Sequence, residues 1–134
     1  MLVRYSRRAG VRVPFLNVAV IDPAEEINEL SGTLKGIQDV LDLDAMRRQI
    51  AELGEQAAAP DLWNDPEQAQ KITSRLSHLQ GELNRVENLG RRLEDVAVLF
   101  ELAEAEDDAD ARREAESELA ALRSEINALE VRTL

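Results

Sequence analysis

Apolar residues recur every three or four positions along most of the chain, the spacing that gathers side chains into one stripe on a helix. The stripe is interrupted three times, so the pattern predicts four successive helices. Each predicted helix has its own apolar positions: Ile27, Leu30, Leu34, Ile37 and Leu41 in the first; Leu43, Met46, Ile50, Leu53 and Ala57 in the second; Ile72, Leu76, Leu79, Leu83, Val86, Gly90, Leu93, Ala97 and Phe100 in the third; and Ala115, Leu119, Leu122, Ile126 and Leu129 in the fourth.

Two of the predicted helices have a clear start signal. Residues 22–25 read Asp-Pro-Ala-Glu, and residues 65–68 read Asp-Pro-Glu-Gln. In each, an aspartate can cap the helix, a proline suits the first helical position, and Glu25 or Gln68 can reach back to the amide of the cap. We therefore expect ordered structure to begin at Asp22 and the third helix to begin after Asp65.

The third stripe is typical of a coiled-coil seam, with Gly90 as its one gap. We expect Gly90 to let a partner helix approach closely, although glycine costs roughly 1 kcal/mol relative to alanine inside a helix. Charged residues beside the seam, such as Arg85, Glu87 and Arg92, are expected to form solvated faces. A turn in the acidic residues 104–110 would make the third and fourth helices antiparallel.

Composition agrees with a fold made of helices. The chain is 44% hydrophobic but only 3% aromatic, so its core must consist of leucine, isoleucine, valine and alanine. The sequence predicts an all-α fold, a helical bundle with a long antiparallel coiled-coil hairpin, over residues 22–134. Because the helices can cover one another's stripes within one chain, we expect a monomer.

The first 17 residues differ from the rest. They contain four arginines and no acidic residue, and Pro14 interrupts their one apolar cluster. We interpret residues 1–21 as a basic, disordered arm or an upstream extension, with Val18 as the true start if its codon is GTG. An organelle transit peptide would share this composition, whereas a secretory signal would need a longer apolar stretch.

From Val18 onward, 12 basic residues face 27 acidic ones, a net charge of −15. Such a surface repels polyphosphates, so direct binding of nucleic acid by this region is not expected. The absence of cysteine excludes disulfides and thiolate metal sites. The longest apolar run, residues 96–100, is far shorter than the roughly 20 residues that cross a bilayer, so no membrane association is expected.

The sequence offers no recognisable arrangement of catalytic groups. His78 is the only histidine, and we expect it on the surface or at the edge of the seam. The acidic residues 104–110 lack the ligand spacing of a calcium loop, and are interpreted as a solvated turn or as a contact for a basic partner. We therefore predict no catalytic, cofactor-binding or metal-binding residue, and no cofactor.

Trp63, the sole tryptophan, lies in the predicted connection between the second and third helices. A large side chain in such a position usually closes the end of a core, or packs on the first turn of the next helix. We expect this packing role for Trp63, with a partner-binding hot spot as the alternative.

The segment around Trp63 resembles a helix-linking signature of the bacterial peptide chain release factor 2 family. Residues 60–71 read Pro-Asp-Leu-Trp-Asn-Asp-Pro-Glu-Gln-Ala-Gln-Lys. Residues 93–103 with the acidic Asp107 and Asp108, and the closing residues 129–132, are similar to the same family, so the resemblance covers residues 21–134.

The resemblance implies a cytoplasmic protein of translation termination that acts at UGA and UAA and promotes hydrolysis of peptidyl-tRNA. The family uses Ser-Pro-Phe and Gly-Gly-Gln motifs for this, and neither occurs in this sequence, so the chain itself is expected not to be an enzyme. The implied partners are the ribosome, at its stalk base, and release factor 3. Two rivals stay open: a free-standing coiled-coil adaptor, and the helical arm of an aminoacyl-tRNA synthetase, which should be basic.

Overall fold

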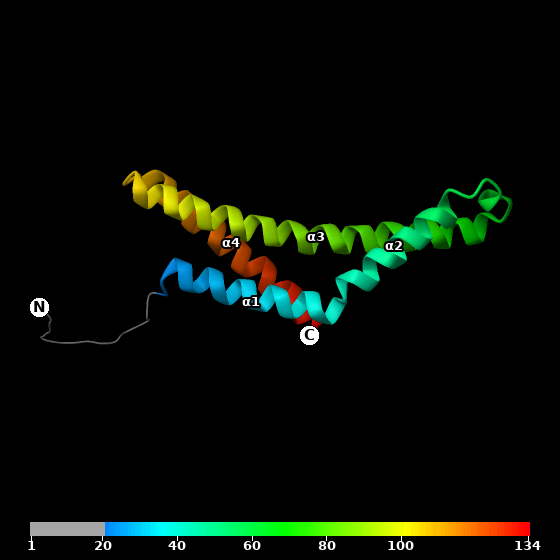
Figure 1. Ribbon diagram of the computed structural model, residues 1–134, viewed down its shortest axis with the longest axis horizontal. Coiled ribbons are helices and arrows are strands. Elements are labelled where there is room, and N and C mark those ends of the chain that lie inside the picture. Colours follow the sequence, from blue (N-terminus) through cyan, green and yellow to red (C-terminus); the bar gives the residue numbers. More distant parts are fainter. Residues whose placement is uncertain (1–20) are drawn as a thin grey trace, which may run out of the picture.

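The computed structural model describes residues 21–134, which form four α-helices and one short 3-10 turn. The elements are α1 (Pro23–Leu41), α2 (Leu43–Ala57), η1 (Leu62–Asn64), α3 (Pro66–Ala105) and α4 (Ala109–Thr133). This part of the chain contains no strand, and the all-α prediction is confirmed. Figure 1 shows an elongated molecule in which α3 runs nearly the full length. The prediction of a basic arm at residues 1–21 falls, except for Ile21, outside the described residues.

Both predicted helix starts are confirmed. Asp22 caps α1 by accepting a hydrogen bond from the Ala24 amide at 3.2 Å, and Asp65 caps α3 by accepting one from the Gln68 amide at 3.3 Å. Pro23 and Pro66 occupy the first helical positions, where a missing N–H leaves no gap in the hydrogen bonding. The expected return bonds from Glu25 and Gln68 to the cap amides are not formed among residues 21–134, so each cap works in one direction.

One residue joins α1 to α2. Asp42 adopts the left-handed conformation, with φ of 56°, which aspartate tolerates better than most residues. Its amide donates to the Gln38 carbonyl at 2.9 Å and closes α1, while its carboxylate accepts from the Ala45 amide at 3.2 Å and starts α2. The chain therefore changes direction here, and α2 leaves α1 toward the far end of α3 (Figure 1).

The core is formed by α1, the second half of α3, and α4. All five positions of the fourth predicted stripe are buried, none more than 3% exposed. They pack against the α1 stripe and one side of α3, so that three helices share one apolar cluster. The cluster comprises Leu30, Leu34, Ile37, Val86, Leu89, Leu93, Val96, Phe100, Ala115, Leu119, Leu122, Ile126 and Leu129.

The buried face of α3 differs from the predicted stripe. Leu89, Val96 and Ala103 are buried although they lie outside that stripe, whereas Leu76 and Leu83 are only half-buried. The physical reason is the change of partners along the helix. The first half of α3 packs on α2 and η1, while the second half contacts α1 and α4 together and needs a wider apolar face.

A turn of three residues, 106–108, reverses the chain between α3 and α4. Asp107 has a left-handed φ of 52°, and the Asp108 carboxylate caps α4 by accepting from the Ala111 amide at 3.1 Å. The turn predicted within residues 104–110 is confirmed, and α4 runs back along α3 (Figure 1).

Charged side chains join the helices above this core. The Arg92 guanidinium of α3 donates to Glu125 of α4 at 2.9 Å through each terminal nitrogen, and to Glu118 at 3.1 and 3.2 Å. The hydrogen bonds to Glu125, which have the largest effect, and those to Glu118 raise the pKa of Arg92. The bond with Arg92 in turn lowers the pKa of Glu125. Arg47 of α2 donates to Glu87 of α3 at 2.8 Å. The prediction of solvated faces was therefore wrong for Arg92, which is only 24% exposed.

We expect Glu125→Gln to destabilise the protein at neutral pH but not in acid. The Glu125 carboxylate binds a proton more weakly in the folded protein than in the unfolded chain, because it is bonded to Arg92. Its bond to Arg92 therefore stabilises the fold at pH values above the ordinary glutamate pKa of about 4.3. That contribution disappears as the pH falls through the lowered pKa that Glu125 has in the folded protein. The Glu125 side chain is half exposed, so the loss at pH 7 should be only about 0.5 kcal/mol.

Urea titrations at pH 7 and at about pH 2, well below the ordinary glutamate pKa, check this expectation. The matched control is Glu114→Gln, an exposed carboxylate on the same helix with no ion pair to any residue of 21–134. The control should match the wild type at both pH values. An equal loss for both variants, or a loss for Glu125→Gln that persists in acid, would contradict the expectation.

We expect Gly90→Ala to stabilise the protein, against the interpretation that close packing requires a glycine. A methyl group on Gly90 would meet only Leu34 Cδ2, at an ordinary contact distance of 3.8 Å. The gain should approach the helix-propensity difference of roughly 1 kcal/mol. Gly81 of the same helix has nothing within 4 Å, so Gly81→Ala is the matched control, measured in the same urea titrations. Stabilisation by Gly81→Ala with destabilisation by Gly90→Ala would restore the close-packing interpretation.

Candidate interaction site

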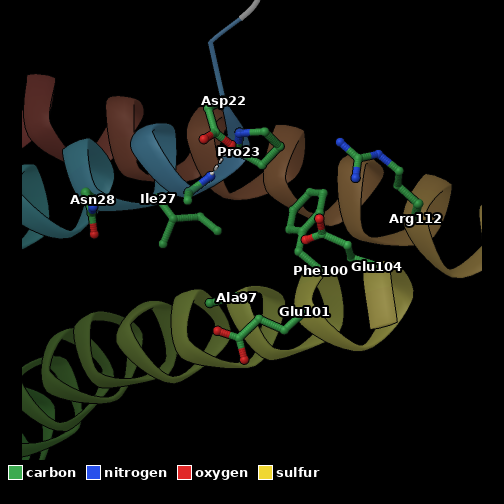
Figure 2. Close-up of a pocket in the computed structure, with 10 residues that line it drawn as sticks. Asp22, Pro23, Ile27, Asn28, Ala97, Phe100, Glu101, Glu104 and Arg112 are labelled. Carbon is green, nitrogen blue, oxygen red and sulfur yellow. Dashed lines mark hydrogen bonds between the residues drawn. The ribbon is translucent and has the colours of Figure 1, made fainter. Parts of the chain in front are cut away.

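A cleft of this helical frame lies where α1 begins, between the end of α3 and the start of α4. Its volume is about 410 Å³. Figure 2 shows its walls: Asp22 and Ile27 from α1 face Ala97 and Phe100 from α3, and Arg112 enters from α4. The start of α1 thus meets the joined ends of α3 and α4 at this cleft.

The cleft combines an apolar floor with charged edges. Ile27, Ala97 and Phe100 supply the floor, and the Arg112 guanidinium lies 5.8 Å from the centroid of the Phe100 ring, within cation–π range. Arg112 also pairs with Glu116, one turn further along α4, at 3.4 Å. The lining contains no hydroxyl, thiol or imidazole, and its charged side chains are those of Asp22, Glu101, Glu104 and Arg112. An apolar floor with charged edges is an arrangement that suits packing or docking.

His78, weighed as a candidate for chemistry, is exposed on α3, in agreement with the surface position expected for it. Within residues 21–134, no three histidine, cysteine, aspartate or glutamate side chains are grouped so that they could hold a metal ion. None of the described helices is long and apolar enough to cross a membrane. The absence of catalytic, cofactor and metal residues remains a prediction.

The acidic residues 104–110 lie at one end of the molecule, at the tip of the α3–α4 pair (Figure 1). Two of the aspartates have internal roles, because Asp108 caps α4 and Asp110 pairs with Arg113. Glu104, Glu106 and Asp107 are exposed at this tip. They form a surface that a basic partner could contact.

Trp63 lies at the opposite end, in η1, and is 63% exposed. The predicted packing role was therefore wrong. Leu62, its neighbour, is half-buried instead, and Ala69 and Ile72 of the following helix α3 are buried. Sequence spacing could not decide which of Leu62 and Trp63 faces inward, because a short 3-10 turn has no long apolar stripe to orient it.

Comparison with known proteins gives one consistent result. The PCRF domain family matches residues 46–134, which include most of α2 and all of η1, α3 and α4. Proteins named peptide chain release factor 2 are similar over most of the chain. The one from Streptomyces avermitilis is 58% identical over 117 residues, covering 87% of this chain and 32% of that protein.

Two further relatives of the same name agree. The protein from Acidothermus cellulolyticus is 61% identical over 113 residues, and the one from Nocardia farcinica is 56% identical over 117 residues; each match covers 84% of this chain and 31% of the relative. This chain thus spans about a third of the length of the curated relatives it matches. With two thirds of its residues inside the family match, the chain belongs to the PCRF domain family.

Proposed function

We propose that this chain acts in translation termination, as the helical domain of a release factor 2-like protein that works at UGA and UAA. The observation that carries the proposal is the identity of 56 to 61% with proteins named peptide chain release factor 2 in three organisms. The family match also supports it, because it covers the long α3, all of α4 and most of α2.

In this proposal the domain docks and does not catalyse. Hydrolysis of peptidyl-tRNA would depend on Ser-Pro-Phe and Gly-Gly-Gln motifs outside this sequence. The lining of the cleft beside Phe100 contains no hydroxyl, thiol or imidazole, which supports a positioning role. The domain would hold the reactive part of the protein in place on the ribosome.

The proposed partners are the stalk base of the ribosome and release factor 3, in the cytoplasm. Charge and shape support this choice. A long helical domain with a net charge of −15 from Val18 onward suits basic ribosomal proteins and is unsuited to RNA phosphates. The exposed acids at the α3–α4 tip lie at one end of the elongated domain (Figure 1).

The rival hypothesis of a coiled-coil adaptor requires an apolar seam that is free to receive a partner helix. In residues 21–134 the stripes of α1, α4 and the second half of α3 bury one another. The first half of α3 is covered by α2. The described helices leave no long unpartnered seam, so the adaptor hypothesis loses its main support.

A domain exchange tests the proposal. Residues 21–134 replace the matching segment of the Streptomyces avermitilis release factor 2, and peptide release is measured on ribosomes programmed with UGA, UAA or UAG. At 58% identity we expect the hybrid to retain release at UGA and UAA within about tenfold of the parent, and none at UAG. The isolated chain should give no release above the rate without factor.

Two controls make the exchange interpretable. A parent protein without the helical domain measures how much release depends on it, and circular dichroism shows that the hybrid is folded. A folded hybrid that releases no better than the domain-deleted protein would contradict the proposal. Release by the isolated chain would contradict the docking role.

A further inference from the structure

The end of the molecule opposite the acidic α3–α4 tip carries an exposed aromatic side chain. It is formed by the last turns of α2, by η1 and by the first turns of α3 (Figure 1). Trp63 is 63% exposed there, and Pro60 beside it is also exposed. A tryptophan held in water is unusual, because burying such a ring against a partner contributes strongly to binding.

Trp63 is held by an ordered turn. The Leu62 amide donates to the Ala59 carbonyl at 3.2 Å, the Asn64 amide to the Asp61 carbonyl at 3.0 Å, and the Asp65 amide to the Leu62 carbonyl at 3.2 Å. Leu62 is half-buried and fastens the turn to α3. The indole is therefore presented on a fixed backbone, and a partner would pay little entropy to order it.

The surroundings of Trp63 attract cations. From residue 51 to residue 70 the chain has five acidic residues and no basic one. Asp61 and Glu67 are exposed on either side of the turn. The last turn of α2 contains no basic residue, so the partial negative charge of the helix end is not neutralised by its own side chains. The acidic residues of this stretch are Glu52, Glu55, Asp61, Asp65 and Glu67.

We propose that Trp63 is a docking point for an arginine- or lysine-bearing segment of a basic protein. The guanidinium or ammonium group would lie on the indole face, and Asp61 and Glu67 would neutralise it. The aliphatic stem of the same side chain would cover Pro60 and the ring. The observations that join here are an exposed indole, a turn held by backbone hydrogen bonds and five carboxylates in a stretch, residues 51–70, that contains no basic residue.

A basic protein fits this surface better than RNA. An indole can also stack on a nucleobase, but nucleic-acid sites place such rings among lysines and arginines that bind the phosphates. Here the ring lies among carboxylates, which repel phosphates. The identification of the partner as a component of the translation machinery rests on the proposed function, while the chemistry of the site does not.

The chain offers a direct test because Trp63 is its only tryptophan. A fluorescein-labelled peptide of alternating arginine and glycine is titrated with the chain, and an unlabelled copy is used to follow Trp63 emission. We expect saturable binding that shifts the emission of Trp63. We expect Trp63→Ala to raise the Kd for the peptide by about three- to tenfold, the range of a partly desolvated cation–π contact, and Trp63→Phe to raise it less. A peptide with citrulline in place of arginine should not bind.

The matched control is Val131→Ala, which shortens an exposed apolar side chain, 82% exposed, on α4 and should leave Kd unchanged. Asp61→Asn should raise the Kd for the peptide by about twofold, because one exposed charge pair is lost. An unchanged Kd for Trp63→Ala, or peptide binding that does not shift the Trp63 emission, would overturn the proposal in favour of general attraction to an acidic surface. A uridine oligomer that shifts the emission at lower concentration than the peptide would also overturn it.

The domain-exchange hybrid separates this inference from the proposed function. If the hybrid fails in release while peptide binding still depends on Trp63, the proposed function falls and the docking point stands. If the hybrid releases peptide normally while Trp63→Ala leaves the Kd for the arginine peptide unchanged, the docking point is contradicted and the proposed function stands.

Discussion

The burial of the α4 stripe between α1 and α3 is the interaction on which the rest of the structure depends. It gathers three helices into one apolar cluster, and Leu122 and Ile126 at its centre are fully buried. Arg92 reinforces the pairing from above by binding two glutamates of α4. Because α2 does not join this cluster, it is free to follow the first half of α3 outward, and the molecule becomes long instead of round (Figure 1).

This division gives the domain two chemically distinct ends on a stiff frame. At one end exposed acids surround the α3–α4 turn, and at the other Trp63 stands on the η1 turn. The 40 residues of α3 run unbroken between these two ends. A helical domain built in this way can contact two partners at fixed positions, as the docking role that we propose would use.

Much of this fold follows from the sequence because the signals are local. Capping aspartates followed by proline mark the starts of α1 and α3, and the fourth stripe lists the buried residues of α4 without error. The prediction failed where the answer depends on which helices meet. The buried face of α3 widens where two helices cover it, Arg92 finds its partners on another helix, and Trp63 stays exposed because Leu62 takes the inward position. None of these is encoded in local spacing.

If the three-helix cluster holds the fold, α2 and η1, which lie outside it, are its least stable parts, and amide hydrogen exchange tests this most directly. We expect the slowest exchange in residues 86–100 of α3 and 115–129 of α4, and exchange in α2 and η1 faster by at least about tenfold, a difference of about 1.4 kcal/mol. Equal protection along both halves of α3 and through α2, or rapid exchange in α4, would contradict it.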